Sequence, residues 1–182
     1  MYNLFIVNSP LQFLGAIEAR DHFKTKDNIL IVTLTEYEKN NEQIHKLLKT
    51  FPWNESIILN YVAKQSKFLE YLKIIKKLQK RTYDYIFIGD FQVLNQLISA
   101  NLKKHSLFLL DDGVATLNLH KHNLRHKKQL HQKFFRRIRY NIFGLKTAIT
   151  DTVNYFSIYD LKPHRNEQIE KNNFNYLKTL KP

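Results

Sequence analysis

The chain has 182 residues, enough for one sizeable hydrophobic core, and no stretch approaches the ~20 uninterrupted apolar residues that a membrane span requires. It has no cysteine, which excludes disulfides, thiolate catalysis and cysteine-ligated zinc and fits a reducing cytoplasm. The net charge of +13 favours polyanions, anionic lipid surfaces or acidic substrates as partners, without choosing among them.

Apolar runs alternate with amphipathic stretches along the chain, which is the pattern of parallel strands connected by helices. The first strand is expected at 4–7. A helix over 10–23 should follow it, because Ser9 can cap a helix and Pro10 suits its first turn. Further strands are expected at 28–34, 56–61, 84–90, 107–110 and 153–158, and further helices at 41–50, 67–80, 93–102 and from Asn166 onward.

Five or six strands in this alternation predict an α/β fold with a Rossmann-like parallel sheet flanked by helices. Ligands of such sheets bind beyond the carboxyl ends of the strands. Three polar segments follow expected strands: Asn8-Ser9, Gly89-Asp90 and Asp111-Asp112-Gly113. We therefore expect them to converge at one edge of the sheet.

The pair Asp111 and Asp112 is the strongest candidate for chemistry. Two adjacent carboxylates at the tip of an apolar strand repel each other and are partly desolvated. Both effects raise the pKa of at least one of the two, towards a value suited to proton abstraction. Gly113 lets the backbone turn there. On local grounds alone, a solvated turn or a helix cap is a slightly better interpretation than a catalytic base.

The segment from Asn8 to Gln12 places amide and hydroxyl groups beside the start of a helix, where a sugar or an anionic group can bind. The glycine-rich fingerprint of dinucleotide sites is absent. For Ser9 taken alone, a simple helix cap is the more ordinary interpretation.

The segment 120–139 carries the densest positive charge of the chain, interleaved with apolar residues. A solvated basic helix is the ordinary interpretation. The apolar side also suits an anionic membrane surface or a partner domain, and the charge suits phosphates.

Two segments, Asn3 to Gln12 and Leu109 to Gly113, together resemble bacterial sialyltransferases of the glycosyltransferase family 52 type, which make lipooligosaccharide and capsule. Members of these families share an acidic-acidic-Gly triplet that carries the general base and a His-Pro pair that holds the CMP of the donor. Only the triplet is found here, because Pro163 precedes His164 and the order is reversed.

The resemblance implies a GT-B fold, in which a second Rossmann-like domain supplies most of the nucleotide site. It makes residues 1–178 the N-terminal, acceptor-side domain and residues 179–182 the start of the interdomain linker, with the C-terminal donor domain absent. We expect little activity from such an isolated domain.

The resemblance also implies that Asp112, or else Asp111, deprotonates an acceptor hydroxyl that attacks the anomeric carbon of CMP-sialic acid with inversion. Asn8, Ser9 and Gln12 would line the acceptor cleft, and Gly113 and Asp90 are further substrate-binding candidates. No metal or cofactor is implied, because CMP is already a good leaving group. The expected partners are the donor, a glycan acceptor and the inner face of the cytoplasmic membrane, with a homodimer left open and no nucleic acid expected.

Two other classes of function remain open. The net charge and the basic segment after Gly113 suit a nucleic-acid-binding protein, which ranks well below the transferase. A regulatory α/β domain that holds magnesium through Asp90, Asp111 and Asp112 is the third hypothesis.

Overall fold

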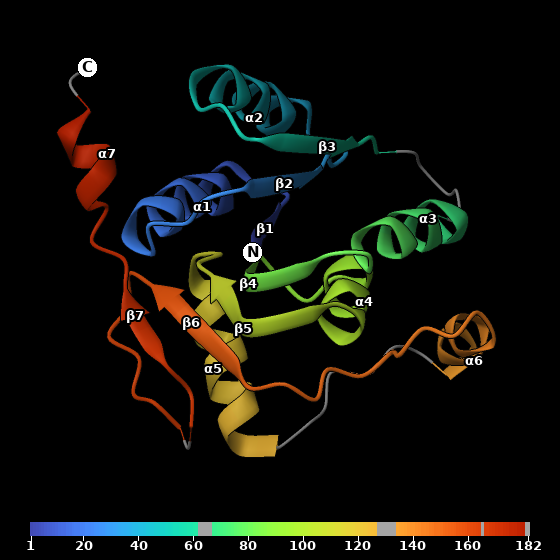
Figure 1. Cartoon of the computed structure of the whole chain (residues 1–182). Helices are drawn as coiled ribbons and strands as arrows, with labels where there is room; N and C mark the ends of the chain where they lie inside the picture. The colour runs from blue at the N-terminus through green and yellow to red at the C-terminus, as the bar shows by residue number, and fades with distance from the viewer. Residues whose placement is uncertain (62–66, 127–133, 165, 181–182) are drawn as a thin grey trace.

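The computed structural model describes residues 1–61, 67–126, 134–164 and 166–180 (Figure 1). The strands are β1 (Tyr2–Val7), β2 (Asn28–Thr33), β3 (Glu55–Leu59), β4 (Thr82–Ile88), β5 (Lys103–Leu110), β6 (Val153–Ser157) and β7 (Ile169–Lys171). The helices are α1 (Pro10–His22), α2 (Glu38–Thr50), α3 (Phe68–Leu78), α4 (Val93–Asn101), α5 (Val114–His126), α6 (Phe134–Ile142) and α7 (Asn175–Thr179).

The strands form one parallel sheet in the order β3-β2-β1-β4-β5-β6-β7. β1 lies inside the sheet, and its Ile6 is in register with Ile31 of β2 and Ile88 of β4. The chain first builds outward from β1 through β2 and β3, then returns to the other side of β1 with β4. The expected Rossmann-like fold is confirmed, and its topological switch point lies between β1 and β4.

Both faces of the sheet are buried, which explains the continuous apolar runs in the sequence. Successive side chains of a strand point to opposite faces, so Leu4 and Ile6 of β1 join one core cluster and Phe5 and Val7 join the other. α3, α4, α5 and α6 contribute to the first cluster, whereas α1, α2 and α7 contribute to the second. The site therefore stands on a sheet covered by helices on both faces.

The C-terminal part of the fold differs from the expectation. The helix predicted from Asn166 onward is wrong, because residues 169–171 form β7, which pairs in parallel with β6. The only helix in the described residues beyond this point is the short α7. β7 has three residues, too few for a periodic pattern, so its pairing with β6 decides its conformation. β5 also begins earlier than predicted, at Lys103, because its polar first half pairs with β4.

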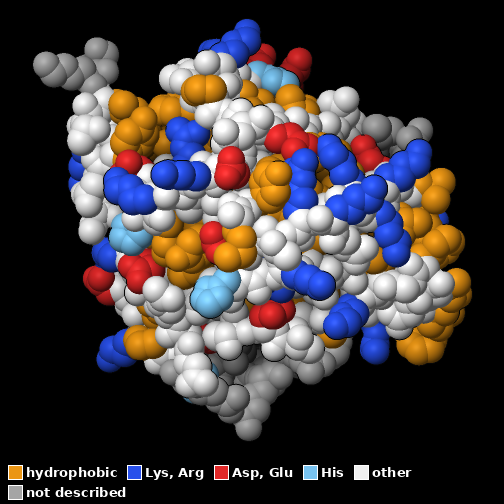
Figure 2. Space-filling view, in the orientation of Figure 1, with side chains coloured by type: hydrophobic (Ala, Val, Ile, Leu, Met, Phe, Trp, Pro, Cys, Tyr) orange, Lys and Arg blue, Asp and Glu red, His pale blue; other side chains and the backbone are white. Residues whose placement is uncertain are grey.

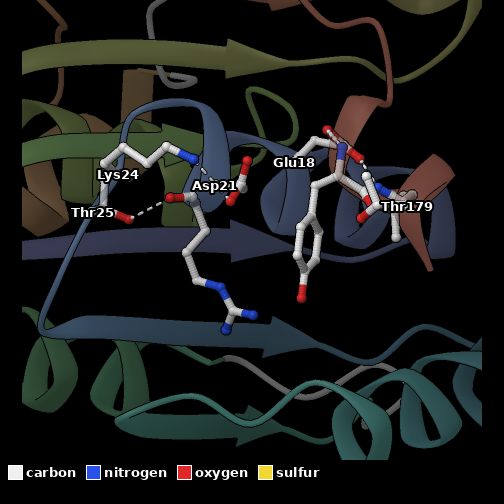
Figure 3. Close-up of polar contacts among 8 residues, drawn as sticks. Glu18, Asp21, Lys24, Thr25 and Thr179 are labelled. Atoms are coloured by element: carbon white, nitrogen blue, oxygen red, sulfur yellow. Dashed lines mark hydrogen bonds and ion pairs between the residues drawn. The ribbon is translucent and has the colours of Figure 1, made fainter.

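The buried carboxylate of Glu18 links α1 to α7, the last described helix. The Glu18 side chain in α1 accepts hydrogen bonds from the backbone N–H groups of Tyr176, at 3.2 Å, and Leu177, at 2.6 Å (Figure 3). These N–H groups belong to the first turn of α7, where a helix has no internal acceptors for them. Glu18 thereby caps α7 and fixes it against α1.

The basic segment 120–139 includes the end of α5 and most of α6, and its residues 127–133 lie outside the described part. None of the helices within the described ranges has the length and apolar character needed to cross a membrane.

Candidate functional site

The carboxyl ends of β1 and β4 meet at the switch point. Gly89 N donates a hydrogen bond to Ile6 O at 2.9 Å, so the two strands end side by side. Just beyond them, Asn8 Nδ2 donates to Asp90 Oδ2 at 2.5 Å. The structure thus brings together two of the side chains that the sequence placed at separate strand ends.

The Gln12 side chain stabilises the loop between β1 and α1. Its buried Oε1 accepts a hydrogen bond from Asn8 N at 2.9 Å. The side chain lies directly against Gly89, where an added Cβ would come within 2.0 Å of Gln12 Oε1. Burial gives Gln12 a positioning role, and Gly89 is the residue that leaves room for it.

Ser9 caps α1, as its ordinary interpretation predicted. Its backbone is extended and its Oγ accepts a hydrogen bond from Gln12 N at 3.3 Å. Pro10 follows at the first helical position, where a missing N–H costs nothing. The N-terminus of α1 is therefore fixed beside Asn8.

Asp90 is held by three donors. Its Oδ1 accepts from Gln92 N at 2.9 Å and from Asn95 Nδ2 at 2.6 Å, and its Oδ2 accepts from Asn8. Burial raises the pKa of the Asp90 carboxyl, and the nearby charge of Asp112 raises it further, while the three donors oppose the shift. Asp90 and Asp112 follow the neighbouring parallel strands β4 and β5, so the two carboxylates belong to the same edge of the sheet.

The neighbours Asp111 and Asp112 have different surroundings. Asp111 is buried, with Oδ1 accepting from Ser157 Oγ at 2.7 Å and Oδ2 accepting from Ile158 N at 2.5 Å. Burial raises its pKa above the usual value for an aspartate, although these hydrogen bonds oppose the shift. Because both oxygens are occupied by β6 and the residue after it, Asp111 joins β5 to β6.

Asp112 is partly exposed. Its backbone N donates to Thr116 Oγ1 at 2.8 Å, which fixes the main chain at the start of α5. Gly113 has a φ of 60°, in the left-handed region that favours glycine, so the chain turns sharply directly after Asp112. Of the two carboxylates, Asp112 is the one within reach of a bound molecule.

A cleft of about 940 Å³ opens beside this edge of the sheet. None of the site residues predicted from the sequence lines it, but Phe91 and Gln92, directly after Asp90, do. Aromatic rings, hydroxyl groups and side-chain amides dominate the walls, and the cations there outnumber the single carboxylate, Glu36. The lining comprises Thr33, Leu34, Thr35, Glu36, Tyr37, Tyr61, Lys67, Phe68, Tyr71, Phe91, Gln92, Val93, Gln96, Arg136, Arg139 and Tyr140.

Tyr71 is a half-buried hydroxyl group of the cleft wall. Burial is the main cause of its raised pKa, with smaller contributions from neighbours that include Tyr140 and Asp90, while Arg136 lowers it. Phe68 lies on the same helix as Tyr71, and the Arg139 guanidinium lies over its ring, 4.0 Å from its centre. The cleft wall thus offers aromatic faces with positive charge next to them.

Sequence reasoning missed this wall. Tyr71 looked like an ordinary member of a surface helix, and Arg136 and Arg139 were counted only as part of a basic segment. The spacing of Arg136, Arg139 and Tyr140 on one helix was visible, but the position of α6 against α3 depends on tertiary packing, seen in the contact of Tyr140 with Phe68.

Within the described ranges, no group of three or more His, Asp or Glu side chains is arranged to hold a metal ion. Of the three carboxylates in the regulatory hypothesis, Asp111 has both oxygens in hydrogen bonds to Ser157 of β6 and to the next residue.

Comparison of the chain with protein-family models, with curated proteins and with solved structures finds no match, so the case for a function rests on the residues and the geometry of the site.

Proposed function

We propose that the chain is the acceptor-side domain of a glycosyltransferase that transfers sialic acid from CMP-sialic acid to a surface glycan, with Asp112 as the general base. One observation carries the proposal: beyond the carboxyl end of β5, next to the switch-point strand β4, Asp112 is a partly exposed carboxylate on a fixed main chain. The likeness of Leu109 to Gly113 and of Asn3 to Gln12 to the sialyltransferase motifs supports the choice of reaction.

In this reaction the Asp112 carboxylate takes the proton of an acceptor hydroxyl. The hydroxyl oxygen forms a bond to the anomeric carbon of the donor sugar while the bond from that carbon to the CMP oxygen breaks. CMP leaves with the electron pair, and the configuration at the carbon is inverted. A positioned base of this kind contributes typically 10²–10⁴-fold to the rate.

The other residues have supporting parts in the proposal. Asn8 and Asp90 fix the loops after β1 and β4 through their mutual hydrogen bond. Asp111 holds the end of β5 in place, so that Asp112 and Gly113 keep their position. We place the acceptor glycan in the cleft, because aromatic faces beside hydroxyl and amide groups suit sugar rings. The donor nucleotide would bind mainly to a second α/β domain, and we place the protein in the cytoplasm.

The test uses the whole gene product, CMP-sialic acid and a panel of terminal galactosides, with CMP release as the readout. Asp112→Asn should reduce turnover at least about 100-fold while the melting temperature stays close to that of the wild type. Asp151→Asn is the matched control, because Asp151 lies just before β6, at the opposite edge of the sheet, and pairs with Lys104. Unchanged turnover in Asp112→Asn would remove Asp112 from the mechanism, and absence of CMP release with every acceptor would remove the proposed reaction.

A further inference from the structure

α6 carries an apolar face that nothing in the described structure covers. Four large side chains are largely exposed: Phe134 at 67%, Phe135 at 84%, Ile138 at 43% and Ile142 at 75%. Their spacing of one, four and eight residues from Phe134 places them on one side of the helix. Figure 2 shows hydrophobic side chains gathered at the edge of the molecule where α6 lies, next to Lys and Arg side chains.

The opposite side of α6 makes the contacts with the rest of the fold. Tyr140 is buried there, and its ring lies 5.1 Å from that of Phe68 in α3. The apolar face is therefore additional to the face that holds the helix in place. An ordinary surface helix has the reverse arrangement, with polar residues directed to water.

Positive charge surrounds this face. Arg136, Arg137 and Arg139 are exposed on the same helix, and α6 has no acidic residue. The sequence contains no Asp or Glu between Gly113 and Asp151, so every residue of permanent charge in that stretch is Lys or Arg. An exposed stripe of Phe and Ile between arginines, on a helix anchored by its other side, has the composition of helices that lie in the interface of anionic bilayers.

We propose that α6 docks the protein on an anionic membrane surface, with Phe134, Phe135, Ile138 and Ile142 inserted among the lipids and Arg137, which does not line the cleft, on the headgroup phosphates. This inference stands independently of the proposed transferase activity.

A second copy of the chain fits the face less well. A symmetric contact would bring the same cluster of arginines against itself, which is electrostatically unfavourable. The face is also small. Large buried side chains contribute roughly 150–250 Å² each, so four partly exposed ones fall short of the ~800 Å² per partner in a standard interface.

The test measures flotation of the full chain with vesicles of phosphatidylcholine, with and without 30% phosphatidylglycerol as an example of an anionic lipid. We expect binding to the anionic vesicles that weakens as salt is raised, and weak binding to the neutral ones. The double variant Phe135→Ser with Ile142→Ser should lose at least about tenfold in apparent affinity, because two large apolar side chains no longer insert. Arg137→Gln should lose about fivefold, the effect expected for one basic residue near the surface.

The matched control is Ile58→Ser with Leu180→Ser, which removes two exposed apolar side chains from other parts of the surface and should bind like the wild type. All five changed side chains are exposed, so the substitutions should leave the core intact, and equal melting temperatures would verify this. The proposal is overturned if the α6 double variant binds as tightly as the wild type, or if the wild type fails to bind anionic vesicles. It is also overturned if the wild type is a dimer in solution that the same double variant converts to a monomer, since the face is then an interface between copies.

Discussion

Glu18 and Leu177 are 159 positions apart in the sequence, yet the carboxylate of the first accepts the backbone hydrogen bond of the second at 2.6 Å. The contact joins α1, which follows β1, to α7, the last described helix. It shows that the final segment is an integral part of the domain, because a buried carboxylate depends on it for hydrogen bonds.

Replacement of Glu18 by alanine should therefore destabilise the fold by about 1–3 kcal/mol, since the N–H groups of Tyr176 and Leu177 lose their acceptor. The free energy of unfolding in urea measures this, and hydrogen exchange at Leu177 should accelerate. Asp21→Ala is the control in the same helix, because Asp21 makes only a surface ion pair with Lys24 and its loss should cost less than ~1 kcal/mol. Equal costs for the two variants would contradict the capping role of Glu18.

The close approach of Gly89 and Gln12 predicts a coupled pair of substitutions. Gly89→Ala should cost about 1–3 kcal/mol, because the new methyl group collides with the buried Gln12 side chain. Gln12→Ala should cost a similar amount, since Asn8 N loses its acceptor. The double variant should be more stable than the sum of the two effects predicts, because the shortened side chain leaves room for the methyl group. Additive costs from chemical denaturation would contradict the collision.

The different surroundings of Asp111 and Asp112 predict different effects of the same change. Asp111→Ala should cost about 1–3 kcal/mol, because the Ser157 hydroxyl and the Ile158 N–H are left without their acceptor. Asp112→Ala should change stability by less than ~0.5 kcal/mol, as expected for a partly exposed side chain away from the core. The free energies of unfolding of the two variants test this. If Asp112→Ala lost more stability than Asp111→Ala, Asp112 would be the structural residue and Asp111 the candidate base.

The raised pKa of Asp90 predicts a specific dependence of stability on pH. Burial is the main cause of the shift, so the folded protein binds the proton more tightly than the unfolded chain does. The stabilisation by protonation is complete below the unfolded pKa of roughly 4 and is lost as the pH rises through the higher folded pKa. The stability of the wild type relative to Asp90→Asn should therefore decrease from acid towards neutral pH, as urea unfolding at several pH values would measure.

Glu55 is the control, because its pKa shift predicts the opposite dependence of stability on pH. Hydrogen bonds from Lys77 and Arg81, at 2.7 Å each, lower the pKa of its carboxyl, so its stabilisation is present above the unfolded pKa and is lost as the pH falls through the folded one. The stability of the wild type relative to Glu55→Gln should increase with pH over the acid range. The same slope for both variants would contradict one of the two assignments.

The sequence was sufficient for the fold class because the strands of a doubly covered parallel sheet are continuous apolar runs. Phe5 and Val7 face one core and Leu4 and Ile6 the other, so residues 4–7 of β1 form an apolar run without a polar position. The sequence was insufficient for β7, whose three residues are too few to show a periodic pattern and whose conformation follows from pairing with β6.

For the candidate site, the sequence predicted which polar residues follow the strands but not how their side chains contact one another. The meeting of Asn8 with Asp90 follows from the sheet topology, and the expected edge was therefore correct. The distinction between Asp111 and Asp112 was beyond prediction, because it depends on Ser157, which reaches Asp111 only when β6 lies beside β5. The cleft wall was missed for the same reason, since Phe68 of α3 and Tyr140 of α6 meet only in the folded chain.

The position of β1 between β2 and β4 has a consequence for biosynthesis. β1 is translated long before β4, its second neighbour, and the Asn8–Asp90 contact spans 82 positions. Until β4 emerges from the ribosome, one edge of β1 has unpaired backbone groups and an apolar surface without its cover. A nascent chain in this state is a substrate for chaperones and is prone to aggregate, and folding through such distant contacts is intrinsically slow.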